Sequence, residues 1–200
     1  MKIKRHLDAL AKLDPDVQRG LELVHYPPPR IRNQGFETFL ATIVSQQIST
    51  DAAAAVMRRV QVLLPRMEAE AVLELPAGAL RAAGLSTRKV EYAESLAKAM
   101  VEKEFDPSTL PGMADQAAIE TITSLRGFGT WSAEIYLMFS LQRSDIFPAG
   151  DLALRVALQK LKGIEQRLND QQARDLVAAW SPYRSAGSLF LWHYYRGAPT

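Results

Sequence analysis

The residue with the clearest chemical potential is Asp151, which follows a Pro-Ala-Gly turn where a helix is expected to begin. An aspartate at this position is usually an N-cap, whose carboxylate accepts a hydrogen bond from the first helical turn. The same position surrounds the carboxylate with N–H groups and the positive end of a helix dipole, which favour its charged form. A fixed anion can also stabilise an oxocarbenium-like sugar while a glycosidic bond breaks. Taken alone, Asp151 is more typical of a cap than of a catalytic group.

A second chemical feature lies upstream, at residues 125–133, which read Leu-Arg-Gly-Phe-Gly-Thr-Trp-Ser-Ala between two expected helices. The two glycines predict a tight turn in which Phe128 pins both helices together. Gly127 and Gly129 can adopt dihedrals closed to other residues and let a phosphate approach the backbone. The N–H groups that open the next helix also suit an anion. Gly-Phe-Gly alone is more typical of an ordinary turn, but together with Asp151 it favours a helix–hairpin–helix that grips the DNA backbone.

The elements that must position these features are helical. Apolar residues recur at helical spacing along most of the chain, and prolines and glycines separate the segments. We expect helices at residues 36–47, 51–64, 115–124, 131–141, 151–161, 170–180 and 184–196, together with a long helix capped by Ser86. Strand-like alternation is nowhere sustained. The sequence therefore predicts an all-α fold.

The composition excludes several other chemistries. The chain of 200 residues has no cysteine, which excludes disulfides, thiol nucleophiles and iron–sulfur clusters. Its three histidines show no metal-ligand spacing, so we expect no metal and no cofactor. Neither a signal peptide nor a membrane span is readable, so we expect a soluble cytoplasmic protein. A net charge of +2 permits a nucleic-acid partner without requiring one.

The hairpin and Asp151, at this separation, resemble the helix–hairpin–helix (HhH-GPD) DNA glycosylase superfamily. The chain is most similar to the bacterial DNA-3-methyladenine glycosylase II family. Besides the hairpin and the Asp151 segment, the resemblance rests on residues 43–49, 84–89 and 180–185, which follow in the family's order. Ordered matches that extend over most of the chain are more specific than any one of them.

The resemblance implies a two-lobed helical fold with the active-site cleft between the lobes. One lobe would comprise residues 36–142 and carry the hairpin, and the other would combine residues 1–35 with 143–200, so that residues 1–200 form one glycosylase unit. Asp151 would lie at the cleft. The residues before the first match read as helix and proline-rich loop, so the fold should lack the extra N-terminal β domain of longer relatives.

The resemblance also implies an enzyme that flips a damaged base out of duplex DNA, while Asp151 stabilises the positive sugar and assists a water. Bifunctional members attack the sugar with a lysine two residues after the second glycine of the hairpin. Here that position is Trp131, which cannot form a Schiff base, so we expect no lyase activity. With the missing cysteines, this favours a monofunctional enzyme of base excision repair that acts on alkylated purines such as 3-methyladenine.

Further roles come from the same resemblance. Trp131 and Trp192 would stack on the flipped base, and a cationic alkylated purine would gain a cation–π interaction. Tyr136 would line the same pocket, with core packing as the alternative for all three rings. Gln47 would fill the gap left by the flipped base or be a solvated helix-end residue, whereas Gln46 is expected to be structural.

The predicted partner is double-stranded DNA with a damaged base, bound by a monomer at the nucleoid, with no membrane partner. The expected DNA-binding residues are Gln47, Gly127, Phe128, Gly129, Thr130, Ser132, Arg88 and Lys89. For the two basic residues, a solvated helix face is the commoner alternative. Two other functions stay open: the same scaffold acting on deaminated or oxidised bases such as uracil and hypoxanthine, and a non-catalytic DNA-binding module in which Asp151 is only a cap.

Overall fold

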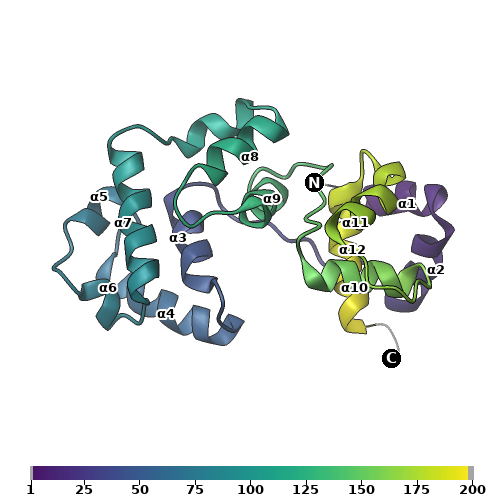
Figure 1. Cartoon of the computed structure of the whole chain (residues 1–200), viewed down its shortest axis with the longest axis horizontal. Coiled ribbons are helices and arrows are strands. Elements are labelled where there is room, and N and C mark those ends of the chain that lie inside the picture. The colour runs from purple at the N-terminus through teal and green to yellow at the C-terminus, as the bar shows by residue number, and fades with distance from the viewer. Residues whose placement is uncertain (1, 198–200) are drawn as a thin grey trace. The chain divides into compact units, whose positions relative to one another are not determined.

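Every regular element in the described part of the chain is helical. The computed structural model describes residues 2–197, and no strand occurs among them (Figure 1). Within these residues no helix is long and apolar enough to cross a membrane. The predicted all-α fold class is confirmed, and residues 2–35 form two helices and a loop without a sheet.

The chain divides into two compact units. The middle unit is Arg32–Ala133, and the terminal unit combines Met1–Ile31 with Glu134–Thr200. The sequence placed the boundary between residues 142 and 143, whereas the structure places it earlier, inside helix α9 (Thr130–Phe139). Periodicity could not locate this point because α9 is buried on all sides from Ser132 to its end, and a uniformly buried helix has no polar face to mark a change of neighbours.

The middle unit is built around phenylalanine rings. Its elements are α3 (Phe36–Ser45), α4 (Thr50–Leu63), α5 (Ala69–Leu73), α6 (Ala79–Ala82), α7 (Thr87–Val101), the 3-10 helix η1 (Pro107–Gly112), α8 (Asp115–Thr123) and the start of α9. The ring of Phe39 in α3 meets Phe105 and Phe128 edge-on, with centroids 5.2 and 5.5 Å apart. Edge-to-face pairs of this kind add to the free energy of apolar burial. The hairpin is thus fastened to the core of its unit through Phe128.

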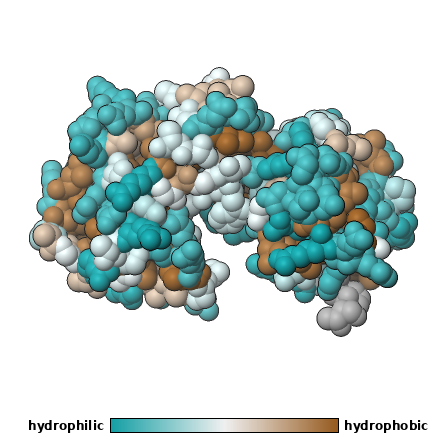
Figure 2. Space-filling model, in the orientation of Figure 1, coloured by the Kyte–Doolittle hydropathy of each residue, from teal (hydrophilic) through white to brown (hydrophobic). Residues whose placement is uncertain are grey.

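The terminal unit is built around a buried helix. Its elements are α1 (Ile3–Leu13), α2 (Pro15–Val24), the end of α9, α10 (Leu152–Leu161), α11 (Asp170–Leu176), the 3-10 helix η2 (Ala178–Trp180) and α12 (Arg184–Gly197). Residues 185–191 of α12 are all buried, and α12 packs against α1, α2 and α10. Polar side chains cover most of the visible face of each unit, with smaller apolar areas between them (Figure 2).

Two predicted helices end earlier than the sequence indicated. The helix expected at 36–47 stops at Ser45, because Gln46 leaves the helical conformation and Gln47 has a left-handed backbone with φ of 56°. The helix expected at 170–180 becomes α11 followed by η2. The predicted cap at Ser86 is confirmed, since its side chain accepts an N–H from the first turn of α7, and Ser49 caps α4 in the same way.

The buried carboxylate of Asp14 connects the N-terminal and the C-terminal segments of the terminal unit. The Oδ2 atom of Asp14 accepts hydrogen bonds from the Trp180 indole N–H and from Lys162 Nζ, each at 2.6 Å, and its Oδ1 atom caps α2. Burial alone would raise the pKa of Asp14, but the hydrogen bonds from Lys162 and Trp180 outweigh burial and hold that pKa below its ordinary value. These bonds link α2, α10 and η2.

We expect Asp14→Asn to lower the free energy of unfolding at pH 7 by about 3 kcal/mol, as for the loss of one partner of a buried ion pair. Because the folded-state pKa of Asp14 is depressed, the ionised carboxylate stabilises the fold above its unfolded pKa of about 4, and this contribution disappears as the pH falls through the folded-state value. Thermal unfolding from pH 7 downward should therefore show the two proteins converging in acid. A constant difference across that range would contradict this role.

Candidate active site

Asp151 is the N-cap of α10, as its sequence context predicted. Its Oδ1 atom accepts the N–H of Leu154 at 3.0 Å, and its own N–H donates to the carbonyl of Pro148 at 2.9 Å. The side chain is half-buried. These two bonds hold a carboxylate at the positive end of a helix, which is the arrangement that could stabilise a developing positive charge. Its catalytic role stays a prediction at this point.

The helix–hairpin–helix has the predicted place in the chain, between α8 and α9. Gly127 has φ of +91°, and a Cβ atom built on it would lie 2.4 Å from the ring of Tyr92. Its carbonyl accepts a hydrogen bond from Gln46 Nε2 at 2.9 Å, so Gln46 has the structural contact that we expected. Gly127 therefore meets both conditions that favour glycine, a left-handed backbone and a close neighbour.

Two other hairpin residues differ from the expectation. Gly129 is outside the left-handed region, and a Cβ atom on it would meet nothing within 4 Å, so its backbone does not require glycine. Phe128 is a buried core residue, which confirms that it pins the hairpin. Its N–H donates to the carbonyl of Leu125 at 3.1 Å, so neither the ring nor this N–H faces DNA. Thr130 is exposed at the start of α9, whereas Ser132 is buried.

We expect Gly127→Ala to destabilise the protein by about 1–3 kcal/mol, because alanine would be strained at this φ and its methyl group would collide with Tyr92. Gly129→Ala is the matched control and should change stability by less than about 0.5 kcal/mol. Thermal denaturation and duplex affinity of both variants check this prediction. Equal unfolding midpoints for the two variants would contradict it.

The turn between α3 and α4 lies beside the hairpin in the middle unit. Gln46 binds the hairpin carbonyl described above, and Lys89 Nζ donates to the carbonyl of Val44 at 2.7 Å. Burial lowers the pKa of Lys89. The turn is therefore held from two sides, with Gln47 exposed between them. Arg88 is also exposed, whereas Lys89 already serves this internal contact, which sequence reasoning did not anticipate.

The aromatic candidates differ in exposure. Trp131 is 43% exposed in the middle unit, so the core-packing alternative does not describe it. Trp192 is half-buried in the terminal unit, where its ring packs on Phe139 with centroids 5.8 Å apart and a tilt of 35°. Tyr136 is only 3% exposed and is mainly a core residue. The guanidinium of Arg30 lies 4.9 Å from the centre of the Phe139 ring, a contact that carried no sequence signal.

The candidate residues thus fall into two groups. The middle unit holds Arg88, Lys89, Gln47, Trp131 and the hairpin, and the terminal unit holds Asp151, Tyr136 and Trp192. In the middle unit, the turn that carries Gln47 is joined to the hairpin and to Lys89. In the terminal unit, Asp151 and Trp192 are each anchored to their own neighbours. Among the described residues, no cluster of His, Cys, Asp or Glu side chains could hold a metal ion.

Comparison with known families covers both the hairpin and the Asp151 segment. The model of the HhH-GPD superfamily of base excision DNA repair proteins matches residues 40–182, which include both the hairpin and Asp151. The chain belongs to the HhH-GPD superfamily. The segments that suggested this membership from the sequence lie within or next to the matched range.

Individual HhH-GPD relatives cover this chain to different extents. DNA-3-methyladenine glycosylase 1 of Schizosaccharomyces pombe is 28% identical over 193 residues, or 92% of this chain and 83% of that one. A Bacillus subtilis protein, provisionally named as a DNA-3-methyladenine glycosylase, is 35% identical over 127 residues, or 62% of this chain but only 43% of its own length. The solved structure of the S. pombe 3-methyladenine DNA glycosylase in complex with abasic DNA matches with a TM-score of 0.83 and 27% identity, covering 96% and 95% of the two chains.

Proposed function

We propose that this protein is a monofunctional DNA glycosylase of base excision repair that hydrolyses the N-glycosidic bond of alkylated purines, such as 3-methyladenine, in duplex DNA. The observation that carries the proposal is the Asp151 carboxylate, fixed at the start of α10 in a chain of the HhH-GPD superfamily. The names of the relatives point to the same substrate class.

In the proposed reaction, the damaged nucleotide rotates out of the helix and the exposed indole of Trp131 stacks on its base. Alkylation at N3 or N7 makes the purine cationic and a better leaving group. As the bond between C1′ and the base nitrogen breaks, its electron pair leaves with the base and positive charge develops on the sugar. The Asp151 carboxylate stabilises that charge. A water adds to C1′ and transfers a proton to the Asp151 carboxylate, which leaves an abasic site.

The residue at the position of the nucleophilic lysine favours a hydrolytic reaction. Trp131 stands where bifunctional relatives carry a lysine, and an indole cannot form a Schiff base with the sugar. We therefore propose that the enzyme has no lyase activity. Hydrolysis by a carboxylate and a water also requires no cofactor.

The middle unit supplies the proposed DNA contacts. Backbone N–H groups of Gly127 and of residues 129–132 would bind phosphates near the start of α9, and Arg88 would add a charge-assisted contact. Lys89 would act by holding the turn that carries Gln47, and Gln47 would occupy the gap left by the flipped base. A single lesion needs only one catalytic carboxylate, so we propose that a monomer acts, at the nucleoid.

A panel of duplexes tests the substrate class. Each duplex carries one lesion, either an alkylated purine, uracil, hypoxanthine or 8-oxoguanine, and the released base and the abasic sites are measured with enzyme in excess. We expect release of the alkylated purine and no covalent complex on borohydride treatment. Faster release of uracil or hypoxanthine would move the assignment to deaminated bases. DNA binding without release of any base would support the non-catalytic module.

A further inference from the structure

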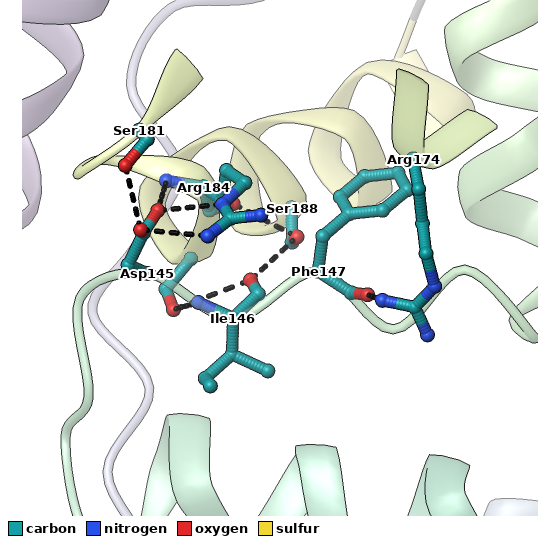
Figure 3. A network of polar contacts seen from close by, with 8 residues as sticks. Asp145, Ile146, Phe147, Arg174, Ser181, Arg184 and Ser188 are labelled. Atoms are coloured by element: carbon teal, nitrogen blue, oxygen red, sulfur yellow. Dashed lines mark hydrogen bonds and ion pairs between the residues drawn. The ribbon is translucent and has the colours of Figure 1, made fainter. Parts of the chain in front are cut away.

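Three consecutive residues immediately before the Asp151 turn are held by side chains from other helices (Figure 3). The segment of residues 145–147 contacts the start of α12 on one side and Arg174 of α11 on the other. All of these residues belong to the terminal unit, as does Asp151. Each of these three residues of the loop before Asp151 is therefore held by at least one side chain from elsewhere in the unit.

The strongest of these contacts joins Asp145 and Arg184. The guanidinium donates from Nε to Oδ1 and from Nη2 to Oδ2, both at 2.7 Å, and Ser181 Oγ adds a third bond to Oδ2 at 2.8 Å. Burial opposes ionisation of Asp145, but the hydrogen bonds from Arg184 and Ser181 outweigh it and hold the pKa of Asp145 below its ordinary value. Two parallel bonds from a planar guanidinium fix direction as well as distance.

The next residue is held through its backbone. The N–H of Ile146 donates to Ser185 Oγ at 2.9 Å, and its carbonyl accepts from the Ser185 hydroxyl at 3.3 Å. The Ser188 hydroxyl lies 3.4 Å from the same carbonyl and is closer, at 2.9 Å, to the carbonyl of Arg184. In addition, the backbone N–H of Ser185 donates to the carbonyl of Ser144 at 3.0 Å. Both serines are completely buried, so these bonds form away from competing water.

Phe147 is held from the opposite side. Its carbonyl accepts from Arg174 Nη1 at 2.9 Å, and Arg174 Nη2 donates to Glu134 Oε1 at 2.8 Å. The Glu134 side chain is 4% exposed, and burial raises its pKa although Arg174 opposes the shift. A buried carboxylate of this kind directs the guanidinium, whose second N–H group then binds the loop.

The clamped residues are close enough to Asp151 to determine where it lies. Only Pro148, Ala149 and Gly150 intervene, and this turn is closed by bonds from Ala149 N–H to the Phe147 carbonyl and from Asp151 N–H to the Pro148 carbonyl, at 2.8 and 2.9 Å. A displacement of Phe147 would therefore pass directly to the Asp151 carboxylate. Sub-ångström misplacement of a catalytic group is enough to slow a reaction.

We propose that Arg184 is a positioning residue for base release, which through Asp145 fixes the loop that aims the Asp151 carboxylate at the sugar. The inference rests on the proposed function, since it requires Asp151 to be the catalytic carboxylate. It assigns a role to Arg184 and Ser185, which belong to one of the segments that carry the resemblance to the family. Neither Arg184 nor Asp145 needs to touch DNA for this role.

The test compares single-turnover excision of an alkylated purine at saturating enzyme. Arg184→Ala should lower the rate constant about 10- to 100-fold and leave duplex affinity within about twofold, because only the aim of the carboxylate changes. Arg184→Lys should be intermediate, since it keeps the charge but loses the paired bonds. Asp145→Ala should be at least as slow as Arg184→Ala, since it also removes the Ser181 bond. The double variant should be no slower than Asp145→Ala, since the paired bonds to Arg184 are already lost there.

The design separates positioning from loss of folding. At saturation the rate constant describes only folded, DNA-bound enzyme, so unfolding lowers the amplitude instead, and Arg184→Lys supplies a second variant if Arg184→Ala folds poorly. Arg19→Ala is the control, since it removes an exposed ion pair with Asp16 in the same unit and should keep the wild-type rate constant. A rate constant for Arg184→Ala or Arg184→Lys within twofold of wild type would overturn the proposal, as would additive losses in the double variant.

Wild type and Asp151→Asn are measured beside these variants. If wild type releases no base, or if Asp151→Asn keeps the full rate, the proposed function fails and the positioning role falls with it. If wild type is active, Asp151→Asn is inactive and both Arg184 variants are normal, only the positioning role is overturned.

Discussion

Asp151→Asn is expected to reduce the rate of base release by at least about 100-fold while the fold and the affinity for DNA stay close to those of wild type. An asparagine has nearly the same shape, and its carbonyl oxygen can still accept the Leu154 N–H that the carboxylate now accepts at 3.0 Å. The cap of α10 is therefore retained. What disappears is the negative charge, which is the property that a positive sugar requires.

Asp106→Asn provides the matched control for this prediction. Asp106 also caps a short helix, since its Oδ1 atom accepts the N–H of Ser108 at 2.8 Å, but it lies at the start of η1 in the middle unit. We expect this variant to keep wild-type activity. Unfolding midpoint, duplex affinity and single-turnover rate are measured for all three proteins. An Asp151→Asn enzyme that keeps more than half of the wild-type rate would make Asp151 a cap and nothing more.

Trp131→Ala should cause the second-largest loss, a fall of about 10- to 100-fold in affinity for the flipped nucleotide, corresponding to a stacking contribution of about 1–3 kcal/mol per base. Because the residue is 43% exposed, its removal should cost less folding free energy than removal of a fully buried tryptophan. Trp131→Phe keeps a ring and should be intermediate.

The informative measurement for Trp131 is the difference in affinity between damaged and undamaged duplexes, since stacking on a flipped base affects only the former. Tyr195→Ala, which removes another exposed aromatic ring from the terminal unit, is the control and should leave that difference unchanged. If Trp131→Ala weakens both duplexes equally, Trp131 contributes to general DNA binding and not to the base pocket.

The features that sequence reasoning predicted correctly are those with local causes. A glycine in a left-handed conformation and an aspartate at a helix start are determined by the few residues around them, so Gly127 and the cap of Asp151 could be recognised. Phe128 was recognised for the same reason, as the one apolar residue between two turn-forming glycines. The helices followed from apolar periodicity, with errors at their ends.

The features that the sequence did not reveal depend on contacts between distant residues. Arg184 meets Asp145 across 39 positions and Arg174 meets Glu134 across 40, and nothing in a single sequence says which charges will pair. Lys89 was expected to contact DNA. Its bond to the Val44 carbonyl was not predicted, because that bond requires two helices to approach each other. The boundary inside α9 was missed because no polar face marks it.

The most direct test of the central claim is chromatography of the free bases released from methylated duplex DNA by wild-type protein and by Asp151→Asn. Our account predicts that wild type releases 3-methyladenine and leaves abasic strands that break only on alkali treatment, whereas Asp151→Asn releases no base above the uncatalysed level. The account would be contradicted if wild-type protein, present in excess over this DNA and bound to it, released no alkylated base.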